Sequence, residues 1–175
     1  MRLPVPLFAA ALLPACAYPE PQGGAPMPLV NSAGQSVGTV TAWETAGGVG
    51  LRIAAAGLPH GIHGIHVHSV GRCDGPGFES AGPHWNSASK KHGLSNPAGA
   101  HGGDLPNVSV AANGTLSVTL AVPGASLSAG PGSLLDADGA ALVLHASADD
   151  NVTDPSGNSG ARIACAVLQP TSARY

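Results

Sequence analysis

Histidines gather in three parts of this chain, and imidazole is the side chain that most often binds metal ions in proteins. One short segment holds His63, His66 and His68. A Gly-, Ser- and Pro-rich stretch then holds His84, His92, His101 and Asp104, and His145 follows alone. Seven histidines and an aspartate exceed the ligand need of one metal, so the sequence predicts two metals and a reaction that they carry out. The remaining histidine, His60, follows Pro59 in a turn, and we expect it to be exposed and unbound.

His66 and His68 are two residues apart, a spacing that puts both side chains on one face of a strand with about 7 Å between their backbones. Two imidazoles so placed can bind one metal, and nitrogen ligands in a flattened geometry suit Cu(II). An isolated pair of this kind is more often a polar strand face. Here further histidines and an acid follow at loop spacing, so metal binding is the favoured interpretation.

The second group of candidate ligands consists of His84, His92, His101 and Asp104. Three imidazole nitrogens and one carboxylate oxygen complete the tetrahedral shell that Zn(II) takes in structural sites. The surrounding segment has the small and polar residues of a loop that can wrap an ion. The alternative, a set of solvent-exposed loop side chains, leaves the whole pattern unexplained.

Composition limits the other function classes. The 175-residue chain has a formal net charge of −3 and no basic tract, so nothing supports nucleic-acid binding. Its length favours one domain. Aromatic residues make up only 3% of the chain, so a core must be built from Val, Leu, Ile and Ala, while 25 glycines and 16 prolines predict many turns.

Strand and turn signals dominate the chain from residue 27 onward. We predict strands over residues 28–30, 39–44, 50–56, 65–69, 108–112, 115–122, 140–145 and 162–168. Asn113-Gly114 between two of them is a strong hairpin signal. Eight or so short strands separated by turns predict an all-β sandwich or barrel. Residues 70–106 and 146–160 remain as long loops, and we expect metal and a disulfide to order the first of them in place of packing.

The first 17 residues differ from the rest, because one arginine, a short apolar run and small residues together predict a secretory signal. The favoured interpretation is a lipoprotein signal in which Cys16 is lipidated and becomes the new N-terminus. Cleavage after Ala17 is the alternative. Either way we expect export to the periplasm or cell envelope, with membrane contact only through a lipid on Cys16. Residues 18–26 predict a flexible tether before a domain over residues 27–175.

Cysteine usage agrees with export. With Cys16 lipidated or removed, Cys73 and Cys165 are the cysteines that remain. An oxidising compartment would let them pair, whereas two buried free thiols are the alternative. A bridge would close a loop of roughly 90 residues, for which the chain-entropy model gives about 4 to 5 kcal/mol.

The chain resembles the copper/zinc superoxide dismutases, of the bacterial exported kind, from about residue 27 to residue 168. The resemblance rests on four ordered motifs: GIHGIHVHSVGRC; SAGPHWNSASKKHG followed by HGGDLPN; ALVLHASADD; and GNSGARIACAV. It implies an eight-stranded Greek-key β-barrel or sandwich with a long metal-binding loop and a second active-site loop. It also implies dismutation of superoxide to dioxygen and hydrogen peroxide by a redox-cycling copper.

The resemblance assigns a role to each matching residue. The implied copper ligands are His66, His68, His84 and His145. The implied zinc ligands are His84, His92, His101 and Asp104, so that His84 would bridge both metals and take a proton on releasing copper. Arg162 would guide and hold the anion beside copper, and Asp149 would hydrogen-bond ligand histidines of both metals. His63 would be structural, and Cys73 and Cys165 would form a disulfide.

The second loop, ADDNVTDPSGNSGA, departs from relatives that place cationic residues around the channel, because it has three acids and no lysine. Lys90 and Lys91 of the SAGPHWNSASKKHG motif are the cations available to compensate for these acids. We therefore expect only modest electrostatic steering of the anionic substrate. The alternative function is an exported copper- or zinc-binding protein without turnover, against which Arg162 argues. A structural envelope lipoprotein would have no use for two complete ligand sets. The sequence leaves a homodimer open.

Overall fold

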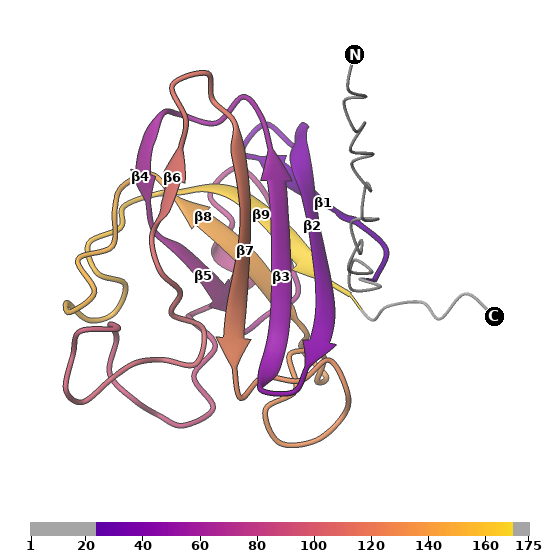
Figure 1. Ribbon diagram of the computed structural model, residues 1–175, viewed down its shortest axis with the longest axis vertical. Helices are drawn as coiled ribbons and strands as arrows, with labels where there is room; N and C mark the ends of the chain where they lie inside the picture. Colours follow the sequence, from indigo (N-terminus) through magenta and orange to yellow (C-terminus); the bar gives the residue numbers. More distant parts are fainter. Residues whose placement is uncertain (1–23, 170–175) are drawn as a thin grey trace, which may run out of the picture.

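The computed structural model describes residues 24–169, which form short strands and one turn of 3₁₀ helix (Figure 1). The elements are β1 (Met27–Asn31), β2 (Ser36–Thr45), β3 (Gly48–Ala55), β4 (Gly61–His63), β5 (Ile65–His68), η1 (Glu79–Ala81), β6 (Val108–Val110), β7 (Leu116–Pro123), β8 (Ala140–His145) and β9 (Arg162–Leu168). Within this part of the chain, no helix has the length and apolar character needed to cross a membrane. The expected signal sequence with Cys16, and most of the expected tether, lie outside the described residues.

Seven strands form one antiparallel sheet in the order β5-β8-β9-β1-β2-β3-β7, and β4 pairs with β6 in a second sheet. The large sheet curls strongly, so the expected all-β Greek-key barrel is confirmed (Figure 1). Alternation explains the central strands, because Val40 and Ala42 of β2 and Leu51 and Ile53 of β3 are all buried. Side chains between them point outward.

Two details of the sheet differ from expectation. β4 was not predicted, because three residues carry too little pattern, and it forms only by pairing with β6. The turn at Asn113-Gly114 is present, closed by a hydrogen bond from the Gly114 N–H to the Ala111 carbonyl at 2.8 Å. The expected hairpin was wrong, however, since β6 pairs with β4 and β7 pairs with β3. A turn signal fixes the local reversal of the chain but not the partners of the flanking strands.

The apolar residues form two clusters on opposite faces of β8. Leu142 and Leu144 belong to the main core inside the barrel. The smaller cluster consists of Phe78, Ala81, Ala141, Val143 and Cys165. Phe78 and Ala81 come from the first long loop, so packing also orders that loop. The expectation that metal and disulfide replace packing there was wrong, because the burial of a single loop phenylalanine leaves no periodic signal in the sequence.

Candidate metal centre

Strand β5 positions the first two histidines of the site. Ile65 and Val67 belong to the main core, so His66 and His68 face the opposite side, where both are buried. Strand β8 lies antiparallel to β5 and ends at His145, whose N–H donates to the Gly64 carbonyl at 2.8 Å. The three imidazoles therefore reach one region on the outer face of the sheet.

The first long loop delivers the other candidate ligands by docking on the edge of β5. The Val67 N–H donates to the Gly103 carbonyl at 2.9 Å, and the Trp85 N–H donates to the Val67 carbonyl at 2.8 Å. A Cβ atom at Gly103 would overlap the Val67 carbonyl oxygen, so only glycine permits this approach. Docking at both the N–H and the carbonyl of Val67, on the free edge of β5, places His84 and Asp104 beside the strand histidines.

The first group of ligands, His66, His68, His84 and His145, brings one nitrogen from each ring within 4.8 Å of the others. Four nitrogens are buried without a hydrogen-bond partner: His66 Nδ1, His68 Nε2, His84 Nε2 and His145 Nε2. A buried polar atom without a partner costs about 1–3 kcal/mol. Four such nitrogens in one place fit a metal, and an all-imidazole set suits copper.

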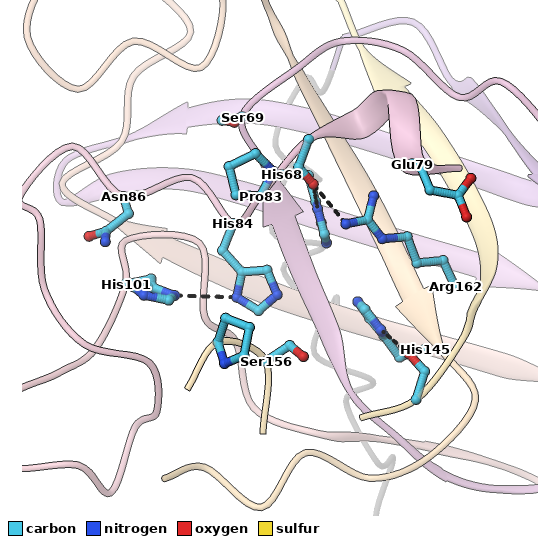
Figure 2. A pocket seen from close by; sticks show the side chains of 13 residues that line it. His68, Ser69, Glu79, Pro83, His84, Asn86, His101, His145, Ser156 and Arg162 are labelled. Carbon is cyan, nitrogen blue, oxygen red and sulfur yellow. Dashed lines mark hydrogen bonds between the residues drawn. The ribbon is translucent and has the colours of Figure 1, made fainter. Parts of the chain in front are cut away.

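The second nitrogen of each ring is held by the protein. His68 Nδ1 lies 2.8 Å from the Gly82 carbonyl, and His145 Nδ1 lies 3.2 Å from the Gly160 carbonyl. His66 Nε2 lies 2.7 Å from an oxygen of Asp149. These contacts fix the orientation of each ring and of its unpartnered nitrogen. Figure 2 shows the rings of His68 and His145 with these contacts.

The second group of ligands, His84, His92, His101 and Asp104, also lies within 4.8 Å. Asp104 Oδ1 lies 2.8 Å from His84 Nδ1, 3.0 Å from His92 Nδ1 and 3.3 Å from His101 Nδ1. A tetrahedral zinc with bonds of 2.0–2.1 Å separates its ligand atoms by about 3.3 Å. The three nitrogens and one oxygen therefore fit zinc.

His84 belongs to both groups of ligands. Its Nε2 is one of the unpartnered atoms of the first group, whereas its Nδ1 faces Asp104 in the second. One buried ring thus presents a nitrogen to each of the two groups of candidate ligands.

Asp149 connects the two groups through their other ring nitrogens. Its Oδ2 lies 2.7 Å from His66 Nε2, and its Oδ1 lies 3.0 Å from His92 Nε2. Gly157 makes this possible, because a Cβ atom there would overlap Asp149 Oδ1 and its φ of +60° favours glycine. This role of Gly157 was not predicted, although its place in the GNSG motif marks it as a residue of the site.

Burial keeps three of the histidines of the first group neutral. It lowers the pKa of His68 to about 2 and the pKa values of His84 and His145 to about 4. Burial alone would raise the pKa of Asp104 and Asp149. Hydrogen bonds from His84 to Asp104, and from His66 and His92 to Asp149, outweigh it, so the Asp104 pKa lies below its usual range and that of Asp149 is about 2. Neutral imidazoles and ionised carboxylates are the forms that bind metals.

A cavity of about 770 Å³ opens onto the first group of ligands, and His68, His84, His145, Glu79 and Arg162 are among its lining residues (Figure 2). Among the lining residues from the described part of the chain, Arg162 is the only lysine or arginine and Glu79 is the only acid. The guanidinium donates to the Phe78 carbonyl at 2.7 Å and to the Gly82 carbonyl at 2.8 Å. Glu79 was missed in the sequence analysis, because no motif marks it.

The charges of the second loop do not lie where the sequence analysis assumed. Asp149 is buried against the histidines, and Asp150 accepts the Val152 and Thr153 N–H groups of its own loop. Asp154 forms an ion pair with Lys91 at 2.8 Å. Lys91 therefore offsets the charge of one of the three acids of this loop, and the strength of steering stays a prediction. Glu79 is the acid that opposes Arg162 in the cavity.

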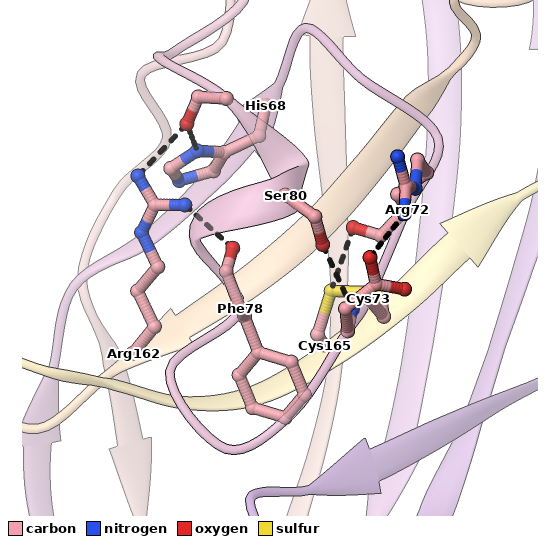
Figure 3. Close-up of a disulfide and its surroundings, with 9 residues drawn as sticks. His68, Arg72, Cys73, Phe78, Ser80, Arg162 and Cys165 are labelled. Atoms are coloured by element: carbon pink, nitrogen blue, oxygen red, sulfur yellow. Dashed lines mark hydrogen bonds and ion pairs between the residues drawn. A yellow bond between two sulfur atoms is a disulfide. The ribbon is translucent and has the colours of Figure 1, made fainter.

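The cysteine pair is a disulfide in this structure, with 5.7 Å between the Cα atoms of Cys73 and Cys165. It fastens the first loop to β9 close to Arg162 (Figure 3). His63 lies outside both groups, with its ring nitrogens 2.8 Å from the His145 carbonyl and 2.9 Å from the Pro59 carbonyl. His60 is exposed and lies outside both groups.

Comparison with known proteins gives a consistent result. The family described as copper/zinc superoxide dismutase matches residues 36–168. Superoxide dismutase-like protein YojM of Bacillus subtilis is 45% identical over 80% of this chain and 73% of its own length. Superoxide dismutase [Cu-Zn] 1 of Aquifex aeolicus is 41% identical over 81% of this chain and 85% of its own length. The crystal structure of a superoxide dismutase-like protein from Bacillus subtilis has a TM-score of 0.80 at 43% identity, covering 83% of this chain and 99% of that one.

Proposed function

Since the chain belongs to the copper/zinc superoxide dismutase family, we propose that it converts superoxide to dioxygen and hydrogen peroxide, with copper and zinc as its metals. One observation carries the proposal. Four buried imidazole nitrogens lie together without a partner, and three of their residues, His68, His84 and His145, line a cavity that also holds Arg162. A redox metal and a cation in one cavity are what a small anionic substrate requires.

Each of the two groups of ligands would bind a different metal. The all-nitrogen group of His66, His68, His84 and His145 would hold copper. The mixed group of His84, His92, His101 and Asp104 would hold zinc. Asp149 would orient one ring of each group, since it hydrogen-bonds His66 and His92.

Copper, when bound, supplies a one-electron change that lets one superoxide leave as dioxygen and a second leave as hydrogen peroxide with two protons. His84 would donate one of these two protons. Its Nε2 would carry the proton while the ring does not bind copper, and would return it to the departing peroxide. Its Nδ1 would stay bound in the zinc group throughout, beside Asp104, which keeps the ring in place.

Arg162 would attract superoxide and hold it by hydrogen bonds. Its guanidinium is held by the Phe78 and Gly82 carbonyls, and Gly82 also accepts a hydrogen bond from His68 (Figure 3). One carbonyl therefore sets the position of both the cation and a copper ligand. Such shared support restricts the anion to a fixed place beside the copper group.

Metal binding without turnover is the alternative, because one relative is named only superoxide dismutase-like. The rate of superoxide decay separates the two. Protein loaded with copper and zinc should speed the decay far above its spontaneous rate over many cycles per copper. A decay that exceeds the spontaneous rate for only about one superoxide per copper would favour the alternative.

Opposite charge changes in the cavity should change the rate in opposite directions. Arg162→Ala should slow turnover roughly tenfold while both metals stay bound, because it removes the attracting cation. Glu79→Gln should raise the rate about twofold at low salt, as expected for one charge about 10 Å from the path. Rates at several salt concentrations check this, since salt should weaken both effects.

Asp138→Asn is the matched control, because it removes the same charge outside the cavity lining and should leave the rate unchanged. Equal rates and salt responses for all three variants and the parent protein would show that neither Arg162 nor Glu79 steers the substrate.

We also propose export, with Cys16 as the site of a lipid anchor. The Cys73–Cys165 disulfide supports export, because such bonds persist in oxidising compartments. The lipid and a homodimer stay predictions.

A further inference from the structure

We propose that Asp154 is a positioning residue for His92, through which the second loop sets how tightly the zinc group holds its metal. The inference rests on the proposed zinc ligands. Asp154 Oδ1 accepts the backbone N–H of His92 at 2.7 Å, although the residues are 62 positions apart in sequence. Its Oδ2 lies 2.8 Å from Lys91 Nζ. The carboxylate of Asp154 thus binds two neighbouring residues, Lys91 and His92, of the loop that carries the second group of ligands.

His92 needs such an anchor, because residues 86–100 contain no helix or extended strand that would fix their backbone. The His92 ring is fully buried, and a carboxylate oxygen lies close to each of its two nitrogens. Its Nδ1 lies 3.0 Å from Asp104 Oδ1, and its Nε2 lies 3.0 Å from Asp149 Oδ1. A backbone shift at His92 would carry Nδ1 out of the zinc group. A hydrogen bond from an N–H to a carboxylate is about twice as strong as a neutral one, which suits it to prevent that shift.

Asp154 and Asp149 act on the same residue in different ways. Asp149 touches the rings of His66 and His92, so its loss would disturb both groups of ligands. Asp154 touches the His92 backbone and Lys91, and neither contact reaches the copper group. Loss of Asp154 should therefore weaken zinc binding selectively.

The hydrogen bond to His92, rather than the ion pair with Lys91, should carry this effect. The side chains of Lys91 and Asp154 are 65% and 38% exposed. Exposed ion pairs contribute little, about 0–1 kcal/mol. Lys91 therefore serves as an internal comparison for the role of Asp154.

Zinc affinity, measured by competition with a chromogenic chelator in protein loaded with both metals, tests the proposal. Asp154→Ala should bind zinc about tenfold more weakly, the lower end of losses caused by removing a ligand's supporting contact. Asp154→Asn should recover most of that loss, because its amide oxygen can still accept the His92 N–H. Lys91→Met should bind zinc nearly as well as the parent protein, and copper affinity should be unchanged in all three variants.

Asp150→Ala is the control on the same loop, because Asp150 accepts N–H groups of its own loop and does not touch His92. It should weaken zinc binding less than Asp154→Ala does. Parent-like zinc affinity in Asp154→Ala, or an equal loss in Asp154→Asn, Lys91→Met or Asp150→Ala, would overturn the proposal. So would a parallel loss of copper. A parent protein that binds no zinc would instead overturn the proposed ligand assignment.

Discussion

Replacing His66 with alanine should remove copper and superoxide dismutation together. The side chain supplies one of the four unpartnered nitrogens, and its other nitrogen is bonded to Asp149. Its loss should weaken copper binding by more than the 10–100-fold typical of losing a supporting contact. Zinc should be largely retained, because His66 is not in the zinc group. Metal analysis and superoxide consumption on the same sample check both expectations.

His60→Ala is the control for this variant. His60 is an exposed histidine outside both groups of ligands, and its Nδ1 lies 2.8 Å from the Val110 carbonyl. Copper content and rate should match the parent protein. Parent-like activity in a His66→Ala protein would show that the first group of histidines is not the catalytic centre.

Removing the disulfide should have the largest effect on stability. Cys73 and Cys165 are 92 residues apart, and closing a loop of that length stabilises the folded state by about 4 to 5 kcal/mol in the chain-entropy model. The Cys73→Ala, Cys165→Ala double variant should therefore melt roughly 10 °C or more below the parent protein. Thermal unfolding of metal-loaded samples, with and without reductant, measures this.

The same variant should also lose activity, because the disulfide fastens the segment whose Phe78 and Gly82 carbonyls hold Arg162 (Figure 3). Reductant should destabilise the parent protein and leave the double variant unchanged, which controls for effects of the reductant elsewhere. A parent protein whose melting temperature and rate are the same with and without reductant would contradict both expectations.

Which candidate ligands lie together could be predicted from the sequence, because their spacing carries geometry. His66 and His68 share a strand face by simple alternation, and the barrel then places His145 beside them. The double role of His84 is different, since no spacing tells which loop histidine lies in both groups. That assignment came from the resemblance, and in the structure His84 is the histidine shared by the two groups.

Contacts between distant segments could not be predicted. Asp154 reaches His92, and Glu79 lies beside Arg162 in the cavity, only because the two loops fold over the same face of β5 and β8. The sequence showed these charges but not their partners, so the ion pair between Lys91 and Asp154 could not be predicted from it. Phe78 was missed for the same reason, because its burial depends on the outer face of β8.

The rate of superoxide decay as a function of copper occupancy tests the central claim most directly. Zinc-loaded protein would be titrated with copper, freed of unbound metal, and mixed with superoxide in a stopped-flow instrument. We expect no acceleration without copper, a linear rise with copper content, and saturation at one copper per chain. A rate that stays at the spontaneous value when the site is full, or one that is fast without copper, would contradict the account.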